Sequence, residues 1–266
     1  MVRANVLKDE RITFTLMKKM SEVDLFVPCF VDQLYPDTAE NMVRILENLG
    51  LKVHYNLNQT CCGQAAFNGG HWDTARELAI KFLNDFTGTR PVVSPSASCT
   101  SYVRNYFPDL LENTIYMNNY RKLSSNIFEL TDFLVNQVGV TDIGAKFQAK
   151  VTIHDSCAAL REYGLRDEPR RLLEKVSGLK IIEMDDSDVC CGFGGTFAIK
   201  HEPISTAMAS QKASNALATG ADYLVTTEAS CILHLDTYFK KQKLPIKCLH
   251  IADILVNFDQ AKLFYD

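Results

Sequence analysis

The tetrapeptide Thr60-Cys61-Cys62-Gly63 recurs as Val189-Cys190-Cys191-Gly192, and this repetition decides the fold. Four further pairs of similar segments flank it in the same order along the chain. These pairs are 24–29 with 151–157, 46–53 with 173–181, 97–99 with 229–231, and 129–136 with 250–257. Because long-range self-similarity marks duplicated units, we expect an N-terminal extension over 1–22, a first half over 23–140 and a second half over 149–258.

The composition is that of a globular protein with about two structural units. Of the 266 residues, 47% are hydrophobic and 23% are charged, with a net charge of -4. This balance argues against a disordered chain and against a surface that binds nucleic acid. No apolar run approaches the ~18–20 residues that span a bilayer, and the first residues lack the apolar core of a secretory signal. We therefore expect a cytoplasmic protein, in which nine cysteines indicate metal or redox chemistry more than disulfides.

Each half alternates short β-prone runs with helical patterns. The β-prone runs are 25–27, 51–55 and 91–94 in the first half, and 151–153, 179–184 and 221–227 in the second. Apolar residues at helical spacing end at Gly50 in the first half and at Gly178 in the second, where a C-terminal glycine is expected. Strands that alternate with helices form a mainly parallel sheet covered on both faces. The predicted fold class is therefore α/β, with two homologous Rossmann-like βαβ halves related by pseudo-two-fold symmetry.

Eight of the nine cysteines fall on the repeat. In each half one cysteine follows the first strand, an adjacent pair precedes a helix, and one follows the third strand. The C-terminal ends of parallel strands lie at one edge of a sheet, so the four thiols of each half are expected to meet there. The candidate metal- and cofactor-binding residues are Cys29, Cys61, Cys62 and Cys99 in the first half and Cys157, Cys190, Cys191 and Cys231 in the second. Cys248 lies outside the repeat, and we interpret it as a packing residue.

Four thiolates are the ligand set of an iron–sulfur cluster and also of a structural zinc ion. Zinc sites usually use C-x2-C knuckles, which neither half contains. Adjacent side chains point apart on an extended backbone, so each cysteine pair suits a multi-iron cluster better than a single ion. Gly63 and Gly192 remove a side chain where the backbone would pass the cluster, and the helices that follow offer a positive dipole end to an anion. We expect metal at these positions, with reduced core cysteines or a thiol redox pair as the alternative.

These motifs resemble the cysteine-rich CCG-domain family of iron–sulfur oxidoreductases, whose members include one of the subunits of heterodisulfide reductase and the iron–sulfur subunit of glycolate oxidase. The stretches that carry the resemblance are TCCGQAAFNGG (60–70), SPSASC (94–99), HDSC (154–157), CCGFGGTF (190–197) and TEASC (227–231). Within that family the chain is most similar to the lactate utilization proteins. The resemblance implies an iron–sulfur electron-transfer subunit that takes part in oxidising a small 2-hydroxy acid, L-lactate, to pyruvate. It also implies a ferredoxin-type iron–sulfur partner subunit similar to lactate utilization protein B.

Two alternatives stay open beside that interpretation. One is a heterodisulfide or thiol reductase subunit that acts directly on a sulfur substrate. The other is a zinc-stabilised binding module. The family often has C-x2-C at its third ligand position, whereas Ser96 and Glu228 stand in the first of those places here. Each half thus keeps four cysteines, which leaves up to one 4Fe-4S cluster per half, and we expect Ser96 and Glu228 to cap the helices that follow them.

The two halves differ in a few polar residues. His154, three residues before Cys157, has Phe26 at its place in the first half. If the halves have diverged in role, His154 and Arg161 mark the half that changed. Residues 1–20 have no counterpart in the second half, and we expect either an appendage that is dispensable for cluster binding or an added edge strand through 13–16.

Overall fold

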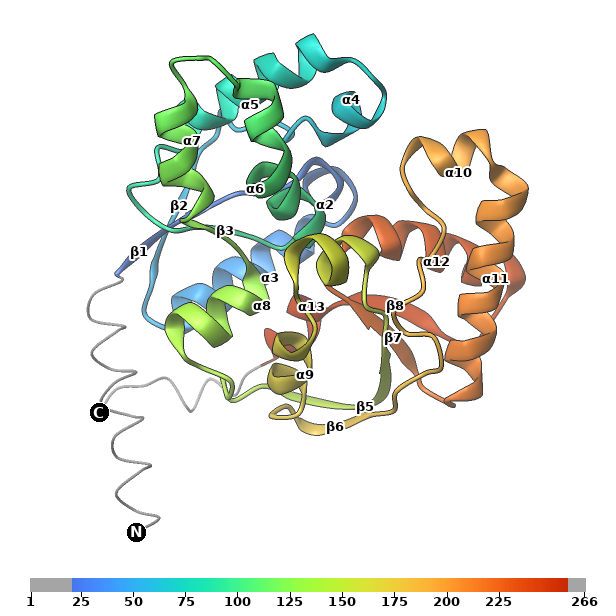
Figure 1. The fold of residues 1–266 in the computed structure, drawn as a ribbon. Coiled ribbons are helices and arrows are strands. Elements are labelled where there is room, and N and C mark those ends of the chain that lie inside the picture. The colour runs from blue at the N-terminus through green and yellow to red at the C-terminus, as the bar shows by residue number, and fades with distance from the viewer. Residues whose placement is uncertain (1–20, 258–266) are drawn as a thin grey trace.

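The computed structural model describes residues 21–257, which form two similar α/β halves (Figure 1). In Figure 1 the first half runs from blue to green and the second from yellow-green to red. The predicted fold class, two Rossmann-like halves of the same design, is confirmed. The expectations for residues 1–20 lie outside the described residues.

Strands and helices follow one another in a similar order in both halves. The first half consists of β1 (Glu22–Leu25), α2 (Cys29–Leu34), α3 (Pro36–Asn48), β2 (Lys52–Tyr55), α4 (Gln64–Asn68), α5 (Trp72–Asp85), β3 (Val92–Ser94), α6 (Ala97–Leu111), α7 (Met117–Ser124), β4 (Ile127–Glu129), α8 (Leu130–Asp132) and the π-helix η1 (Phe133–Val138). The second half consists of β5 (Lys146–Ile153), the π-helix η2 (Ala158–Tyr163), α9 (Asp167–Leu173), β6 (Ser177–Ile181), α10 (Thr196–Lys200), α11 (Glu202–Ala218), β7 (Tyr223–Thr226), α12 (Ala229–Gln242), β8 (Lys247–His250) and α13 (Ile251–Leu255).

Each half contains a four-stranded parallel sheet. The strand order is β2-β1-β3-β4 in the first half and β6-β5-β7-β8 in the second. The β-prone runs predicted three strands per half, and the fourth strand of each sheet, β4 or β8, was missed. Strand β4 reads Ile-Phe-Glu and β8 reads Lys-Cys-Leu-His, so neither contains adjacent β-branched residues like Val92-Val93 of β3. Because all strands are parallel, the segments that follow β1, β3, β5 and β7 emerge at the C-terminal edges of the two sheets.

Helix α3 shows how the sequence fixes these elements. Pro36 is its first residue, where the missing N–H costs nothing. Met42, Ile45 and Leu46 form its buried face, and the chain leaves the helix at Gly50 with a positive φ of 76°. The predicted helical stripe and its glycine stop are therefore confirmed.

One hydrophobic core spans the two halves, and each half has a further core of its own. The buried members of the spanning core come from both halves and include Met42, Leu46, Leu173 and Leu255. Helix α13 ends the second half and packs on α3 of the first, whereas α8 and η1 end the first half and pack on α9 of the second. Each half therefore completes its partner's core, and we expect the two halves to unfold together.

A hydrogen bond from a hydroxyl to an aspartate links each half to the helix that ends the other half. The Thr38 hydroxyl of α3 donates to Asp253 of α13 at 3.0 Å. The Tyr163 hydroxyl of η2 donates to Asp132 of α8 at 2.6 Å. Asp132 and Asp253 occupy matching positions in the last repeated segment, so the same residue type ties each half to the other.

None of the helices within residues 21–257 is long and apolar enough to cross a membrane.

Candidate metal centre

The eight repeated cysteines lie in the segments that follow strands at the C-terminal edges of the two sheets, and several of them lie at helix N-termini. Cys29 is the first residue of α2, and Cys157 immediately precedes η2. Cys99 and Cys231 are the third residues of α6 and α12. The Cys61-Cys62 and Cys190-Cys191 pairs precede α4 and α10. A helix N-terminus carries free N–H groups and a partial positive charge, which stabilise negative charge on a nearby sulfur.

In the first half the four thiols form one connected group. The Cys29 thiol donates to Cys61 Sγ at 3.6 Å, and the Gly63 backbone N–H lies 3.5 Å from the same sulfur. The pKa of Cys61 is lowered because it accepts hydrogen bonds, first from Cys29 and then from Cys62 and Gly63. The pKa of Cys62 is raised because its thiol interacts with Cys61 and Cys99 and is buried. The sulfurs of the cysteine after β1, of the Cys61-Cys62 pair and of the cysteine after β3 therefore lie close together.

The second half repeats this arrangement. The Cys191 thiol donates to Cys231 Sγ at 3.4 Å, and the Gly192 N–H lies 3.4 Å from Cys190 Sγ. The pKa of Cys190 is lowered by hydrogen bonds from Cys157 and Cys191. Hydrogen bonding from Cys191 is the main cause that lowers the pKa of Cys231 to about 5. Both thiols of each adjacent pair face the same group, so the expectation that they diverge is wrong.

Gly63 and Gly192 serve a different purpose from the one expected. Both have a positive φ, 94° and 97°, which turns their N–H groups toward the sulfur two residues earlier. A Cβ on Gly192 would stand 2.7 Å from the carbonyl oxygen of Ser205, and one on Gly63 would stand 3.1 Å from Cβ of Leu78. The glycines are therefore required by backbone conformation and by close packing on α11 and α5.

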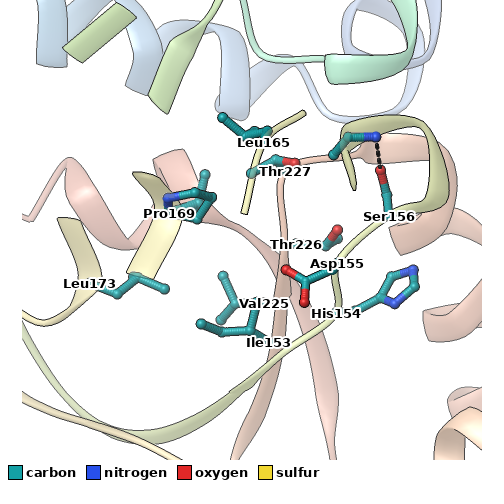
Figure 2. Close-up of a pocket in the computed structure, with 12 residues that line it drawn as sticks. Ile153, His154, Asp155, Ser156, Leu165, Pro169, Leu173, Val225, Thr226 and Thr227 are labelled. Carbon is teal, nitrogen blue, oxygen red and sulfur yellow. Dashed lines mark hydrogen bonds between the residues drawn. The ribbon is translucent and has the colours of Figure 1, made fainter. Parts of the chain in front are cut away.

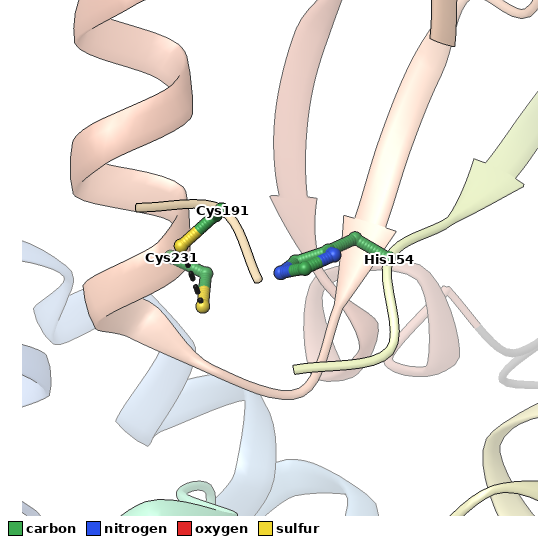
Figure 3. Close-up of side chains that lie close together, drawn as sticks. All are labelled: His154, Cys191 and Cys231. Carbon is green, nitrogen blue, oxygen red and sulfur yellow. Dashed lines mark hydrogen bonds between the residues drawn. The ribbon is translucent and has the colours of Figure 1, made fainter. Parts of the chain in front are cut away.

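The second group contains a residue for which the first has no equivalent. His154 is 1% exposed. One of its ring nitrogens and the sulfurs of Cys191 and Cys231 all lie within 4.8 Å of one another (Figure 3). The sequence singled out His154 only as a difference from Phe26. Its approach to the thiols depends on the turn between β5 and Cys157, which the spacing of residues does not reveal.

Ser96 and Glu228 start the helices α6 and α12, and only Ser96 behaves as expected. The Ser96 hydroxyl accepts from the Cys99 N–H at 3.3 Å and so caps α6. Glu228 makes no side-chain cap on α12. Its carboxylate accepts instead from the N–H of Ser98 at 2.9 Å and from the hydroxyl of Ser96 at 3.1 Å, both in the other half. The prediction that Glu228 caps its own helix is therefore wrong, since it caps α6 across the interface.

This bridge brings the two cysteine groups to the same interface. Helix α6, which carries Cys99, packs on η2, which follows Cys157. Helix α12, which carries Cys231, packs on α2, which begins at Cys29. The burial of Glu228, followed by the nearby Cys231, raises the pKa of its carboxyl to about 7. The two groups therefore face each other across the contact between the halves.

A small cavity borders the second group at the end of β5 (Figure 2). Its walls include Ile153, His154, Leu165 and Val225, and its volume is about 10 Å³, which is room for one water molecule. Thr226 Oγ1, which belongs to the wall, is buried and has no hydrogen-bond partner within residues 21–257. The cavity therefore suits an ordered water and is too small for a 2-hydroxy acid.

Cys248 lies apart from both groups. It belongs to β8, is buried, and packs among the apolar residues of the second half. Burial raises the pKa of its thiol, so it is expected to stay protonated and inert.

The donor set fits a thiolate-bound metal or cluster. All nine cysteines lie within the described residues, and none of them forms a disulfide there. Each half offers four sulfurs from three separate segments, on backbone that is held by helix N-termini and glycine N–H groups. Such a site stabilises negative charge on sulfur, which is what a metal ligand requires.

Comparisons with known proteins agree with this arrangement. The profile of the "Cysteine-rich domain" family, CCG, matches residues 23–104 and again residues 151–236. Lactate utilization protein A of Halalkalibacterium halodurans is 37% identical over 241 residues, which cover 91% of this chain and 99% of that protein. Lactate utilization protein A of Bacillus subtilis is 37% identical over 234 residues, which cover 88% of this chain and 98% of that protein.

A solved structure shares the fold. The crystal structure of a hypothetical protein from Helicobacter pylori superposes with a TM-score of 0.61 over 96% of this chain, at 10% identity, and this chain spans 55% of its length. That likeness concerns the fold alone, whereas the duplicated cysteine pattern and the 37% identity concern the sequence. Two matches to the family profile, each containing one complete group of four cysteines, show that this chain belongs to the CCG cysteine-rich domain family.

Proposed function

We propose that this chain is an iron–sulfur electron-transfer subunit in the oxidation of L-lactate to pyruvate. The proposed ligands are Cys29, Cys61, Cys62 and Cys99 for one 4Fe-4S cluster and Cys157, Cys190, Cys191 and Cys231 for a second. The observation that carries the proposal is the presence of two matched groups of four thiols. The substrate follows from the relatives named lactate utilization protein A.

An iron–sulfur cluster supplies one-electron transfer, and two of them would match the two electrons that leave L-lactate when it loses two protons and becomes pyruvate. Backbone N–H groups of this chain would stabilise the negative charge on the cysteine sulfurs that bind the clusters. The Gly63 and Gly192 N–H groups point at Cys61 and Cys190, and helix N-termini lie behind the other sulfurs. Hydrogen bonds to cluster sulfurs tune the reduction potential, so these backbone donors are expected to set it here.

The proposed partner is a ferredoxin-type iron–sulfur subunit similar to lactate utilization protein B. This chain contains no C-x2-C-x2-C-x3-C run of the ferredoxin kind. The electrons would therefore pass from the two proposed clusters to clusters of that kind in the partner. We further propose 23–140 and 149–258 as the duplicated units, preceded by the extension 1–22.

The decisive experiment is purification without oxygen, followed by analysis of iron, acid-labile sulfide and zinc. We expect a brown protein with about four irons per half, and lactate-dependent dye reduction only when the partner is added. A colourless, zinc-loaded protein would support the zinc-stabilised binding module instead. Iron-loaded protein that reduces a disulfide substrate but not dye with lactate would support the heterodisulfide or thiol reductase.

A further inference from the structure

The two cysteine groups differ at one buried position beside the sulfurs. Phe26 and His154 each stand three residues before the first cysteine of their half. Their backbones are equivalent, because the Phe26 N–H donates to Val93 O and the His154 N–H donates to Val225 O, both at 2.9 Å. The side chains have diverged. Phe26 packs edge-on against Phe82, with ring centroids 4.8 Å apart, whereas His154 faces thiols.

The hydrogen bonding of His154 defines which ring nitrogen is free. Its Nδ1 lies 3.3 Å from the carbonyl oxygen of Ser187. Since a carbonyl oxygen only accepts, Nδ1 carries the proton of the neutral ring and Nε2 keeps its lone pair. Nε2 is buried and has no hydrogen-bond partner among the described residues. Figure 3 shows the ring directed from the end of β5 toward Cys191 and Cys231.

The carbonyl that orients the ring is itself held firmly. The Asp155 N–H and the Lys212 ammonium both donate to Ser187 O, at 3.1 and 3.3 Å. The Ser187 hydroxyl donates to the Asp155 carboxylate at 3.0 Å. The Arg170 guanidinium donates two hydrogen bonds to the same carboxylate, at 2.8 and 2.9 Å. A histidine whose Nδ1–H is fixed by a backbone carbonyl, with carboxylate support behind it, is the arrangement that orients metal-ligating imidazoles.

Another histidine of this chain shows what a purely structural ring looks like. His250 is also completely buried. Its Nε2 donates to Pro95 O at 3.0 Å, and its Nδ1 accepts from the Ala252 N–H at 3.2 Å. Both of its nitrogens are satisfied, whereas His154 keeps one nitrogen unpaired beside two sulfurs. The ring of His154 instead interacts with the Cys231 thiol and helps to lower the pKa of that thiol, so its free nitrogen lies beside a proposed metal ligand.

We propose that Nε2 of His154 is a nitrogen ligand of the metal centre in the second half, in place of one of its four thiolates, so that the two halves hold chemically unequal sites. The first half offers sulfur alone, and the second offers four sulfurs and an imidazole. This inference rests on the proposed iron–sulfur function. A neutral imidazole on iron raises the reduction potential relative to thiolate. The second-half cluster should therefore be reduced before the first.

The test is pulsed electron paramagnetic resonance on the full chain, reconstituted without oxygen, reduced, and labelled with ¹⁵N only in histidine. We expect a strong histidine ¹⁵N coupling to the reduced cluster in the wild-type protein. The coupling should persist in Cys62→Ser, in which the first site is impaired, and should disappear in the double variant Cys191→Ser/Cys231→Ser, in which the second site keeps only two thiols and the imidazole. His154→Phe, which copies the first half, should lose the coupling and lower the midpoint potential of the second cluster.

His234→Gln is the matched control, because His234 is near the second group but its Nε2 is already bonded to Ser205 Oγ at 3.2 Å. This variant should keep both the coupling and the potential. Protein that contains both clusters but shows no histidine coupling would overturn the inference and leave the proposed function standing. Protein without iron and sulfide would overturn the proposed function, and the inference with it. The spectra of the wild type, Cys62→Ser and Cys191→Ser/Cys231→Ser decide the question even if His154→Phe fails to fold.

Discussion

The carboxylate of Glu228, at the start of α12 in the second half, accepts a 2.9 Å hydrogen bond from the Ser98 backbone N–H in the first turn of α6 in the first half. Ser98 precedes Cys99, and Glu228 lies three residues before Cys231. One carboxylate therefore fixes the relative position of the two helices that carry the third ligand segment of each half. A disturbance at this contact is expected to reach both cysteine groups.

Glu228→Ala should reduce the free energy of unfolding of the apoprotein by ~1–3 kcal/mol, because the partly buried N–H of Ser98 and the buried hydroxyl of Ser96 lose their acceptor. Glu228→Gln keeps an acceptor oxygen and should retain most of the stability. Urea unfolding of the three proteins at one pH measures the difference. Equal stability of the alanine variant and the wild type would show that the bridge contributes nothing.

Cys62→Ser should lower iron and sulfide per chain by about half, because it removes one thiolate from only one of two four-cysteine sites. Cys248→Ala is the control, since Cys248 lies in β8 outside both groups, and its iron content should match the wild type. Metal and sulfide analysis after anaerobic reconstitution gives the answer. Full iron in Cys62→Ser would remove this residue from the site.

Leu255→Ala should cost ~2–5 kcal/mol of stability, because it opens a cavity in the core that both halves share. The loss should appear as one cooperative transition that moves to lower temperature, and not as early melting of the second half alone. Leu57→Ala is the matched control, because Leu57 is 87% exposed and should change little. Two separate calorimetric transitions in Leu255→Ala would contradict a shared core.

The Glu129 carboxyl should contribute a loss of apoprotein stability as the pH rises from about 5 to 8, in the opposite direction to the thiols whose pKa is lowered. Glu129 is completely buried, and burial raises the pKa of its carboxyl from 4.5 to about 8. Between these values the folded chain keeps a proton that the unfolded chain has lost. Each pH unit in this window therefore lowers the free energy of unfolding by up to ~1.4 kcal/mol from this group.

Glu129→Gln removes that titration, so the melting temperature of this variant should rise relative to that of the wild type as the pH increases. Glu112→Gln, at an exposed glutamate, should leave the slope as it is. Melting curves recorded from pH 5 to 8 compare the three proteins. An unchanged slope in Glu129→Gln would mean that Glu129 is ionised in the folded protein over this range.

The sequence by itself determined the duplication, the parallel α/β design and the eight cysteines that gather at two sheet edges. The repeat aligns Cys29 with Cys157 and Cys99 with Cys231, and parallel strands necessarily end at one edge. These inferences needed only local patterns and one general rule of sheet geometry, which is why the linear order of residues was enough to make them.

Tertiary structure alone decided how the halves join and where they differ. Glu228 meets Ser98 across 130 positions of sequence, and α13 crosses to pack on α3. His154 reaches Cys191 and Cys231 only because the Ser187 carbonyl, held by Asp155, fixes its ring. Such contacts join residues that are far apart in the chain, and side-chain direction in a loop follows from the packing around it. Neither spacing nor periodicity encodes that packing, so only the folded chain reveals it.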